Sequence, residues 1–100
     1  MAGIDEKVGL RTPNNGGKSV TNIPKWKFEV VRAAILAQLA TGPCKMKDLT
    51  EAIRPRIDAE ALEKLGKLGW HMMGVKLELE VRGEIRRQPG VTPQTVELVG

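Results

Sequence analysis

The sequence predicts an α+β domain in which three to four helices precede a C-terminal two-stranded β-hairpin, with an extended arm at the N-terminus. Apolar residues recur at helical spacing from residue 25 to about residue 82. After residue 83, two short segments of alternating pattern flank a turn sequence, as expected of a hairpin. Residues 1–24 carry turn-forming residues without a helical pattern. We therefore expect the arm over residues 1–24 and the folded domain over residues 25–100.

The arm contains RTPNNGG, residues 11–17, which is typical of a turn because proline fixes φ while Asn and Gly tolerate positive φ. KSVTNI, residues 18–23, could form a short strand after it. GGKS, residues 16–19, resembles part of a phosphate-binding loop, but Thr12 stands where that motif needs its first glycine. A phosphate-binding loop is followed directly by a helix, but here Pro24 comes so soon after GGKS that no helix can start at that point. We interpret this segment as a surface turn.

The first predicted helix begins at Lys25 and is stopped by Gly42 and Pro43. One face of this helix carries apolar residues at i, i+3, i+7 and i+11, which are Phe28, Val31, Ile35 and Leu39. A short extended piece follows at residues 43–45. The same kind of apolar spacing then recurs at Met46, Leu49 and Ile53. This predicts a second helix that ends at Pro55.

A third helical segment is predicted over AEALEKLGKLG, residues 59–69, with Asp58 as its N-cap. Most of its residues are good helix formers, but Gly66 and Gly69 loosen it. We therefore expect two short helices and a flexible corner before the last helix.

The stretch VKLELEVRGEIRR, residues 75–87, alternates apolar and polar side chains and could form either a strand or a helix. A helix over residues 69–82 would carry two apolar faces that lie nearly opposite each other. The first face is formed by Leu68, Met72, Val75 and Leu79, and the second by Trp70, Met73, Leu77 and Val81. Because Leu, Glu, Lys and Met are strong helix formers, we favour a helix that stops at Gly83 and a strand that begins near Glu84.

The polar residues of this last helix fall between its two apolar faces. His71, Glu78 and Arg82 lie on one flank, and Lys76 and Glu80 lie on the other. Beyond the helix, EIRRQ and QTVELV flank PGVTP, which predicts two strands joined by a tight loop.

The net charge of +4 and the pI near 9.5 favour a nucleic-acid partner, so the location of the charge matters. Residues 25–69 carry nine basic and six acidic groups, whereas residues 70–100 carry four of each. The excess of positive charge therefore lies in the middle of the chain rather than in the last helix and hairpin.

Catalysis and metal binding are poorly supported by the composition. His71, Cys44 and Ser19 are the only residues of their types, and the chain has no tyrosine. The local sequence pairs no nucleophile with a base, and one Cys and one His fall short of the four ligands of a structural zinc site. We therefore expect no enzymatic activity, no metal and no cofactor.

The sequence also predicts where the protein resides. The longest apolar run, VVRAAILAQLA, is far shorter than the roughly 20 residues that span a bilayer. Residues 1–24 lack the apolar core of a signal peptide. A single cysteine cannot form an internal disulfide, which fits a reducing compartment. We expect a cytoplasmic protein without membrane contacts.

The predicted order is helix, short extended piece, one or two helices, longer helix and β-hairpin. This is the order of a winged helix, in which the hairpin is the wing. Leu79, Glu80, Gly83, Ile85 and Arg87, which read LExxGxIxR, resemble the helix end and wing start of winged-helix transcriptional regulators of the antibiotic-resistance-regulator type.

The span from about Gly9 to Val99 is more similar still to a small bacterial family of uncharacterised proteins. That family carries a TPN-type arm, a KY or KF helix start and a GWW…V.LDLE..G segment. The matching residues here are Thr12-Pro13-Asn14, Lys27-Phe28, Gly69-Trp70, Val75, Leu77-Glu78-Leu79-Glu80 and Gly83. This chain has His71 and Glu78 where the family has a second aromatic residue and an aspartate. The resemblance implies the fold and carries no established function.

A winged helix places the polar outer face of its third helix in the major groove, while the wing and the start of the second helix contact phosphates. The residues expected near phosphates at the second helix are Lys45 and Lys47. Those on or beside the reading helix are Lys67, His71 and Lys76, and those on the wing are Arg86, Arg87 and Gln88. Our leading hypothesis is a regulatory module that binds double-stranded DNA.

Two features of the predicted reading helix oppose this hypothesis. The face that should point at DNA is apolar, and its burial could contribute ~1.5–3 kcal/mol per large side chain. Glu78 and Glu80 would repel phosphates. We expect this face to be covered by a second copy in a symmetric dimer, or by arm residues Val8, Leu10, Val20 and Ile23. The alternative is therefore a protein-interaction or homodimerisation module with interface residues Trp70, Met73, Leu77 and Val81 and no DNA binding.

Overall fold

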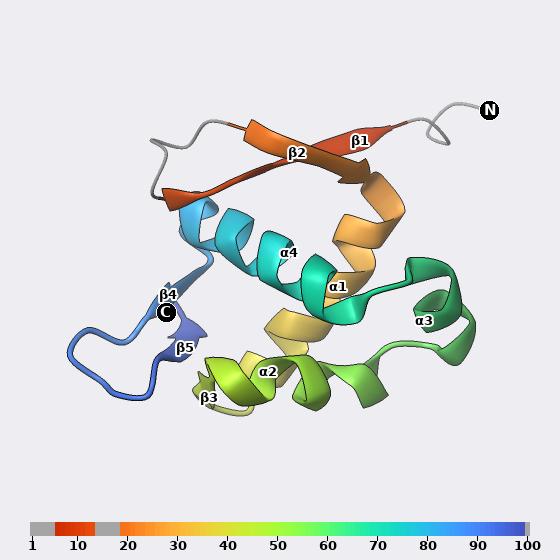
Figure 1. Ribbon diagram of the computed structural model, residues 1–100. Coiled ribbons are helices and arrows are strands. Elements are labelled where there is room, and N and C mark those ends of the chain that lie inside the picture. The colour runs from red at the N-terminus through yellow and green to blue at the C-terminus, as the bar shows by residue number, and fades with distance from the viewer. Residues whose placement is uncertain (1–5, 14–18, 100) are drawn as a thin grey trace.

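The computed structural model describes residues 6–13 and 19–99, apart from the side chains of Ser19 and Val20. These residues form four α-helices and two small antiparallel sheets, which confirms the predicted α+β class (Figure 1). The strands are β1 Lys7–Arg11, β2 Ser19–Pro24, β3 Cys44–Lys45, β4 Ile85–Arg87 and β5 Thr95–Leu98. The helices are α1 Lys25–Leu39, α2 Met46–Ile53, α3 Ala59–Leu65 and α4 Leu68–Arg82, and a 3-10 turn, η2 Arg54–Arg56, follows α2.

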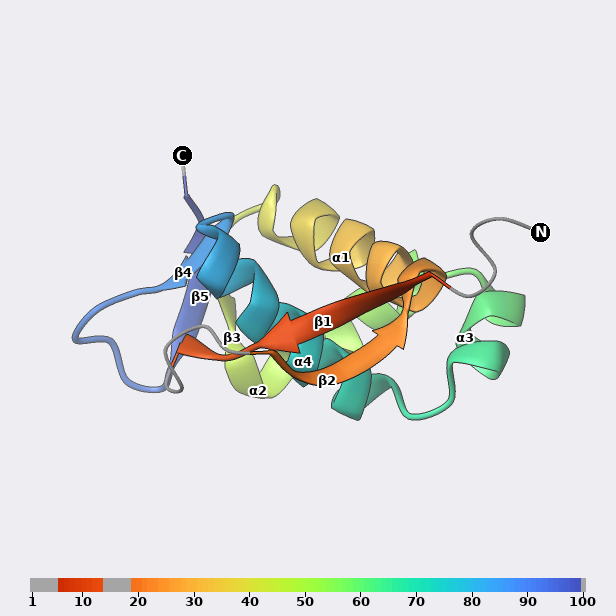
Figure 2. The same ribbon diagram turned by 90° about the horizontal axis from the view of Figure 1, so that it is seen from above.

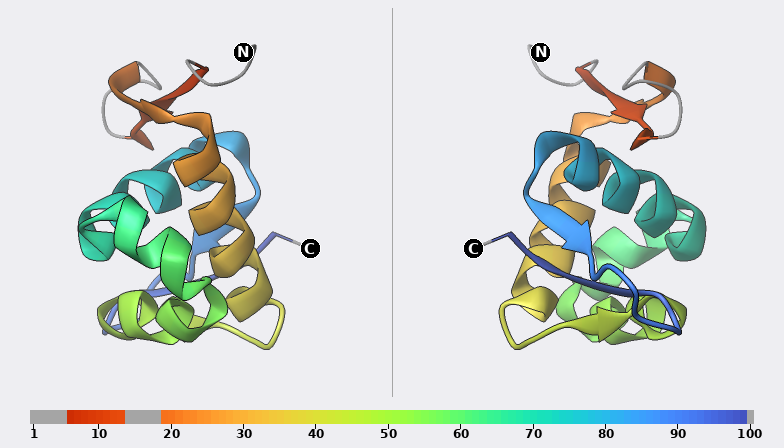
Figure 3. Two further views of the ribbon diagram at one scale, coloured as in Figure 1. Left: turned by 90° about the vertical axis from the view of Figure 1, so that its right-hand side faces the viewer. Right: turned by 90° about the vertical axis from the view of Figure 1, so that its left-hand side faces the viewer.

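The elements are stacked in three layers, which Figure 3 shows from the two sides. The β1–β2 hairpin is the upper layer and lies over α4 and the start of α1 (Figure 2). Helix α4 is the middle layer and α2 lies below it, while α1 packs against α4 and runs from the β1–β2 hairpin down to the level of α2 (Figure 1). The side chains that are most deeply buried between these layers include Val31, Ile35, Leu49, Ile53, Val75 and Leu79.

Two antiparallel strands are present close to the C-terminus, within a three-stranded sheet. Strands β4 and β5 are antiparallel, with Ile85 opposite Leu98. The other edge of β5 pairs with β3, where Cys44 lies opposite Val96, so the extended piece predicted at residues 43–45 becomes the third strand of this sheet. The N–H of Met46 donates to the carbonyl oxygen of Gln94 at 2.9 Å. The start of α2 is therefore fixed beside the base of the hairpin loop.

The arm differs from the extended segment that the sequence predicts. The strand expected at residues 18–23 is present as β2, but β1 is a strand as well, and the two form an antiparallel ribbon with Leu10 opposite Thr21. Five residues of the predicted turn and of the GGKS segment, 14–18, lie outside the described residues. The arm thus contains two strands where the sequence predicts one, and these strands satisfy each other's backbone hydrogen bonds.

Local signals for helix ends are confirmed by their geometry. The Asp58 carboxylate accepts the N–H groups of Glu60 at 3.1 Å and Ala61 at 3.3 Å, as an N-cap should. Gly83 ends α4 in the left-handed region with φ of 77°, which a residue with a Cβ atom would adopt only with strain.

Helix α4 packs on two sides, as its alternating pattern predicts. The residues of its first apolar face, Leu68, Met72, Val75 and Leu79, are all buried. On a second side the arm docks at Gly74, where an added Cβ would lie 2.8 Å from Leu10 Cδ1. Leu10 and Ile23 are buried, and Val8 is half-buried and packs against the core, so part of the arm covers one edge of this side of the helix. The Val20 side chain lies outside the described part.

A buried carboxylate fastens the arm to α4. Glu78 Oε1 accepts the backbone N–H of Arg11 at 2.9 Å, and Glu78 Oε2 accepts Arg11 Nη2 at 2.6 Å and Arg82 Nε at 2.7 Å. Burial raises the pKa of Glu78, but the hydrogen bonds from Arg11 and Arg82 outweigh burial and lower that pKa to about 2. Glu78 therefore stays charged inside the protein because two guanidinium groups and one amide surround it.

The free energy of unfolding should depend on Glu78 in a pH-dependent way. Its pKa is depressed in the folded state, so the stabilisation is complete above the ordinary value of 4.5 and is lost as the pH falls toward 2. We expect Glu78→Gln to lower the free energy of unfolding by about 2–3 kcal/mol at neutral pH. The difference from the parent protein should shrink between pH 4.5 and 2 in urea unfolding followed by tryptophan fluorescence.

Glu63→Gln is the matched control, because Glu63 is an exposed carboxylate of α3. This control should leave stability within about 0.5 kcal/mol of the parent protein at each pH. A loss in Glu78→Gln that is the same at every pH would contradict the role of the charge.

Candidate functional site: helix α4 and the β4–β5 hairpin

Two of the residues predicted to contact DNA from α4 are buried. His71 is 8% exposed, with its Nδ1 atom 2.7 Å from the Lys67 carbonyl oxygen, and Lys76 is 2% exposed. A helical wheel gives the direction of these side chains but not the elements that cover them. The prediction that His71 and Lys76 lie at the DNA-facing surface is therefore corrected, whereas Lys67, at the N-cap of α4, is exposed as expected.

Lys76 belongs to a chain of ion pairs that connects α4 to the hairpin. Its ammonium contacts Glu80 one turn later. The other oxygen of Glu80, Oε1, lies 3.4 Å from Arg87 Nε on β4. Lys76 and Glu80 are both largely buried, so each needs the other's charge to offset the cost of leaving water. Glu80 therefore links α4 to β4, a role that the sequence does not predict.

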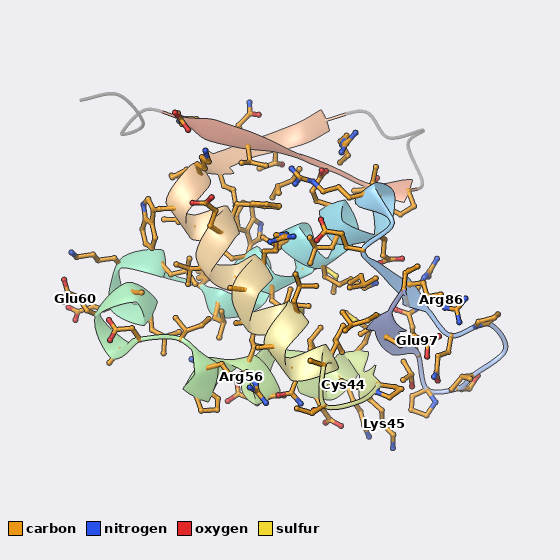
Figure 4. All side chains as sticks on the ribbon, turned by 180° about the vertical axis from the view of Figure 1, so that it is seen from behind. Cys44, Lys45, Arg56, Glu60, Arg86 and Glu97 are labelled. Carbon is orange, nitrogen blue, oxygen red and sulfur yellow. The ribbon has the colours of Figure 1, made fainter. Side chains whose placement is uncertain are left out.

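The three wing residues are held by carboxylates. Arg86 and Glu97 face each other across β4 and β5, with Arg86 Nε 2.7 Å from Glu97 Oε2, as Figure 4 shows. Gln88 Nε2 donates to Glu97 Oε1 at 2.9 Å. These hydrogen bonds from Gln88 and Arg86 hold the pKa of Glu97 below its usual value. Part of the positive charge of the hairpin is thus already balanced.

Lys45 and Lys47 lie close to the wing. Lys45 is in β3, directly opposite Thr95 of β5, and Lys47 is in the first turn of α2. Both are exposed. Figure 4 shows Lys45 on the same side of the molecule as Arg86. The structure thus brings together the predicted phosphate contacts of α2 and of the hairpin at one end of the molecule.

The second apolar face of α4, which the sequence predicts to be covered, is partly exposed. Trp70 is 53% exposed and Met73 is 44% exposed, while Leu77 and Val81 are half-buried. Between this face and the arm lies a groove of about 200 Å³, lined by Leu10, Arg11, Thr12, Thr21, Trp70, Met73, Gly74 and Leu77. The arm therefore covers only one edge of the second apolar face, and Trp70 and Met73 remain in contact with solvent. We call these two residues the α4 outer face.

Other chemistry has little support from the geometry. Burial and the nearby charge of Asp48 raise the pKa of the Cys44 thiol, which keeps it protonated and unreactive. Across residues 6–13 and 19–99, His, Cys, Asp and Glu side chains form no group of three or more that could hold a metal ion. In the same ranges, no helix has the length and apolar content needed to cross a membrane.

Comparison with known proteins places the chain in a family. Residues 7–96 match a family of unknown function, DUF6958, and the chain belongs to it. This agrees with the uncharacterised small domain that the sequence resembles. None of the curated proteins and none of the solved structures matches the chain.

Lys76 should behave as a structural residue rather than as a surface cation. We expect Lys76→Met to lower the free energy of unfolding by about 2–4 kcal/mol, because Glu80 would stay buried with only the more distant Arg87. Adding Glu80→Gln should restore part of the loss. Lys47→Met, at an exposed site, should change stability by less than about 0.5 kcal/mol. Equal effects of the two lysine variants in urea unfolding would show that Lys76 is solvated.

Proposed function

We propose that this protein is a non-enzymatic binding module whose principal contact surface is the α4 outer face, and that the partner is a second copy of the chain. The observation that carries this proposal is the exposure of Trp70 and Met73, next to each other on a helix that is otherwise well packed. Large aromatic side chains and methionine are enriched at protein interfaces, where their burial contributes most.

The surroundings of the α4 outer face suit contact with an identical surface. The groove beside Trp70 is lined mainly by uncharged residues, and the charge of Arg11 at its edge is balanced by Glu78. Two copies related by a two-fold axis would therefore bring together groove linings whose one charged residue is already balanced. Each copy also offers both a projecting side chain, Trp70, and an adjacent groove that could receive it.

The same geometry makes α4 a poor base-reading helix. Base readout needs hydrogen-bonding side chains along the face that enters the major groove. The outer face of α4 offers Trp70 and Met73 instead, while the polar residues His71, Lys76 and Glu78 are buried. This supports self-association over sequence-specific DNA reading by α4.

Sedimentation tests the proposal. We expect the full chain to form a dimer at micromolar to submillimolar concentration, and the double variant Trp70→Lys/Met73→Lys to be a folded monomer, because two exposed apolar side chains would be replaced by like charges. The matched control is Trp26→Lys, since Trp26 of α1 is also exposed, at 39%. A parent protein that stays monomeric throughout, or a dimer that the double variant leaves intact, would overturn the proposal.

A second candidate function is contact with the backbone of duplex DNA. It is favoured by the exposed cations Lys45, Lys47, Arg86 and Arg87 at one end of the molecule. On this proposal, the wing and the start of α2 contact phosphates, in the manner of a winged helix, and α4 reads no bases. A winged helix remains part of this proposal, and it is supported by the order of the elements from α1 to β5.

Salt dependence separates backbone contact from self-association. Four phosphate contacts would give a slope of log affinity against log salt concentration of about −3 to −4. The affinity should therefore fall steeply between about 50 and 200 mM salt. Lys45→Gln/Lys47→Gln should reduce the slope by about 2. Lys64→Gln, on α3, should leave it unchanged. The DNA proposal fails if fluorescence anisotropy detects no binding of a labelled duplex at low salt.

A further inference from the structure

An open groove lies between the β4–β5 hairpin and the arm. It has a volume of about 660 Å³. Pro13 of the arm contributes to its lining, and Pro89 and Val91 of the hairpin loop contribute apolar surface from another element. Ile85 and Glu80, both largely buried, also reach it. The groove thus combines apolar surface with a charged patch, which is the usual composition of a small-molecule site.

Arg86 and Arg87, which form the positively charged part of the groove, have hydrogen-bond donors without a partner among the described residues. Arg87 approaches Glu80 only through Nε, at a loose 3.4 Å, and half of its side chain is exposed. Arg86 is bound to Glu97 through Nε as well. Within the described residues, the Nη atoms of both arginines have no hydrogen-bond partner. An arginine in this state presents the planar edge that binds a carboxylate or phosphate through two parallel hydrogen bonds.

The charge balance of the groove favours an anion. Three cations lie in or behind it, Lys76, Arg86 and Arg87, against two carboxylates, Glu80 and Glu97. Glu80 is already in contact with the Lys76 ammonium and Glu97 with Arg86, so each carboxylate is balanced without Arg87. An anion that binds Arg87 would therefore leave each of these carboxylates with another positively charged partner.

We propose that this groove binds a small organic anion, with its oxyanion on the guanidinium of Arg87 and its apolar part against Pro13, Pro89 and Val91. A nucleic-acid backbone is polar and would not bury the apolar surface of the groove. The lining therefore favours a small amphipathic anion over a polymer. This site is separate from the α4 outer face and does not depend on self-association.

The probe for this proposal is phenyl phosphate, which carries an oxyanion and a compact apolar ring. In a titration of the full-length protein followed by ¹⁵N–¹H NMR, the amide signals of residues 86–88, 90 and 91 should shift and saturate. Inorganic phosphate should bind more weakly, because it lacks the apolar part. Arg87→Gln should weaken phenyl phosphate binding about tenfold or more, as expected for the loss of a charge-assisted hydrogen bond. Arg54→Gln, which alters an exposed arginine paired with Glu51, should bind like the parent protein.

Several results would overturn the proposal. One is the absence of saturable shifts up to about 20 mM probe, which corresponds to a binding free energy too small for a built site. Another is equal affinity of the parent protein and Arg87→Gln while both give folded spectra. A third is that a short DNA duplex, and not phenyl phosphate, shifts the same signals in an Arg87-dependent way, which would assign the groove to backbone contact.

Discussion

The carboxylate of Glu78 is the interaction on which the upper half of the molecule depends. A buried charge is costly unless it is paired and hydrogen-bonded, and Glu78 meets that requirement with groups from two elements. Arg11 brings in β1, and Arg82 extends the contact to α1 because its guanidinium lies 4.6 Å from the centre of the Phe28 ring. One carboxylate thereby joins the arm, α4 and α1. The close approach of Leu10 at Gly74 completes this docking.

The docking of the arm determines which surfaces of α4 remain exposed. Helix α4 packs against the core on one side and against the arm on another. On a third side, Lys76 and Glu80 form ion pairs that reach Arg87 of β4. The strip with Trp70 and Met73 is where this helix leaves large apolar side chains exposed. Exposed cations elsewhere include Lys45 and Lys47, at β3 and the start of α2, and Arg86 and Arg87 on the hairpin. The molecule therefore presents an apolar surface and a charged end that can be changed independently by mutation.

Much of the fold could be predicted from the sequence because its signals are local. The spacing of Phe28 and Val31, the cap at Asp58 and the stop at Gly83 each specify an element without reference to distant residues. Strand β1 could not be predicted in this way, because it is short and interrupted by Gly9. It depends on pairing with β2 and docking on α4, which are non-local contacts.

The candidate site was predictable only in part, for the same reason. Alternation in residues 75–82 correctly indicates a helix packed on two sides, whereas the exposure of Trp70 depends on how far the arm reaches over the second apolar face. The burial of His71 and Lys76 depends on which elements cover the flanks of α4, and no periodicity contains that information. A buried flank could have been suspected from Glu78 and Arg82, because an i, i+4 pair of opposite charge was already visible there.

We infer that the β1–β2 hairpin and α4 form one cooperative unit, so that α4 is not free to enter a DNA groove on its arm side. Native-state hydrogen exchange tests this most directly, because it measures the opening free energy of each segment. If they form one unit, the amides paired between β1 and β2 should exchange with the same opening free energy as the central amides of α4. Rapid exchange throughout β1 and β2, while α4 stays protected, would contradict it.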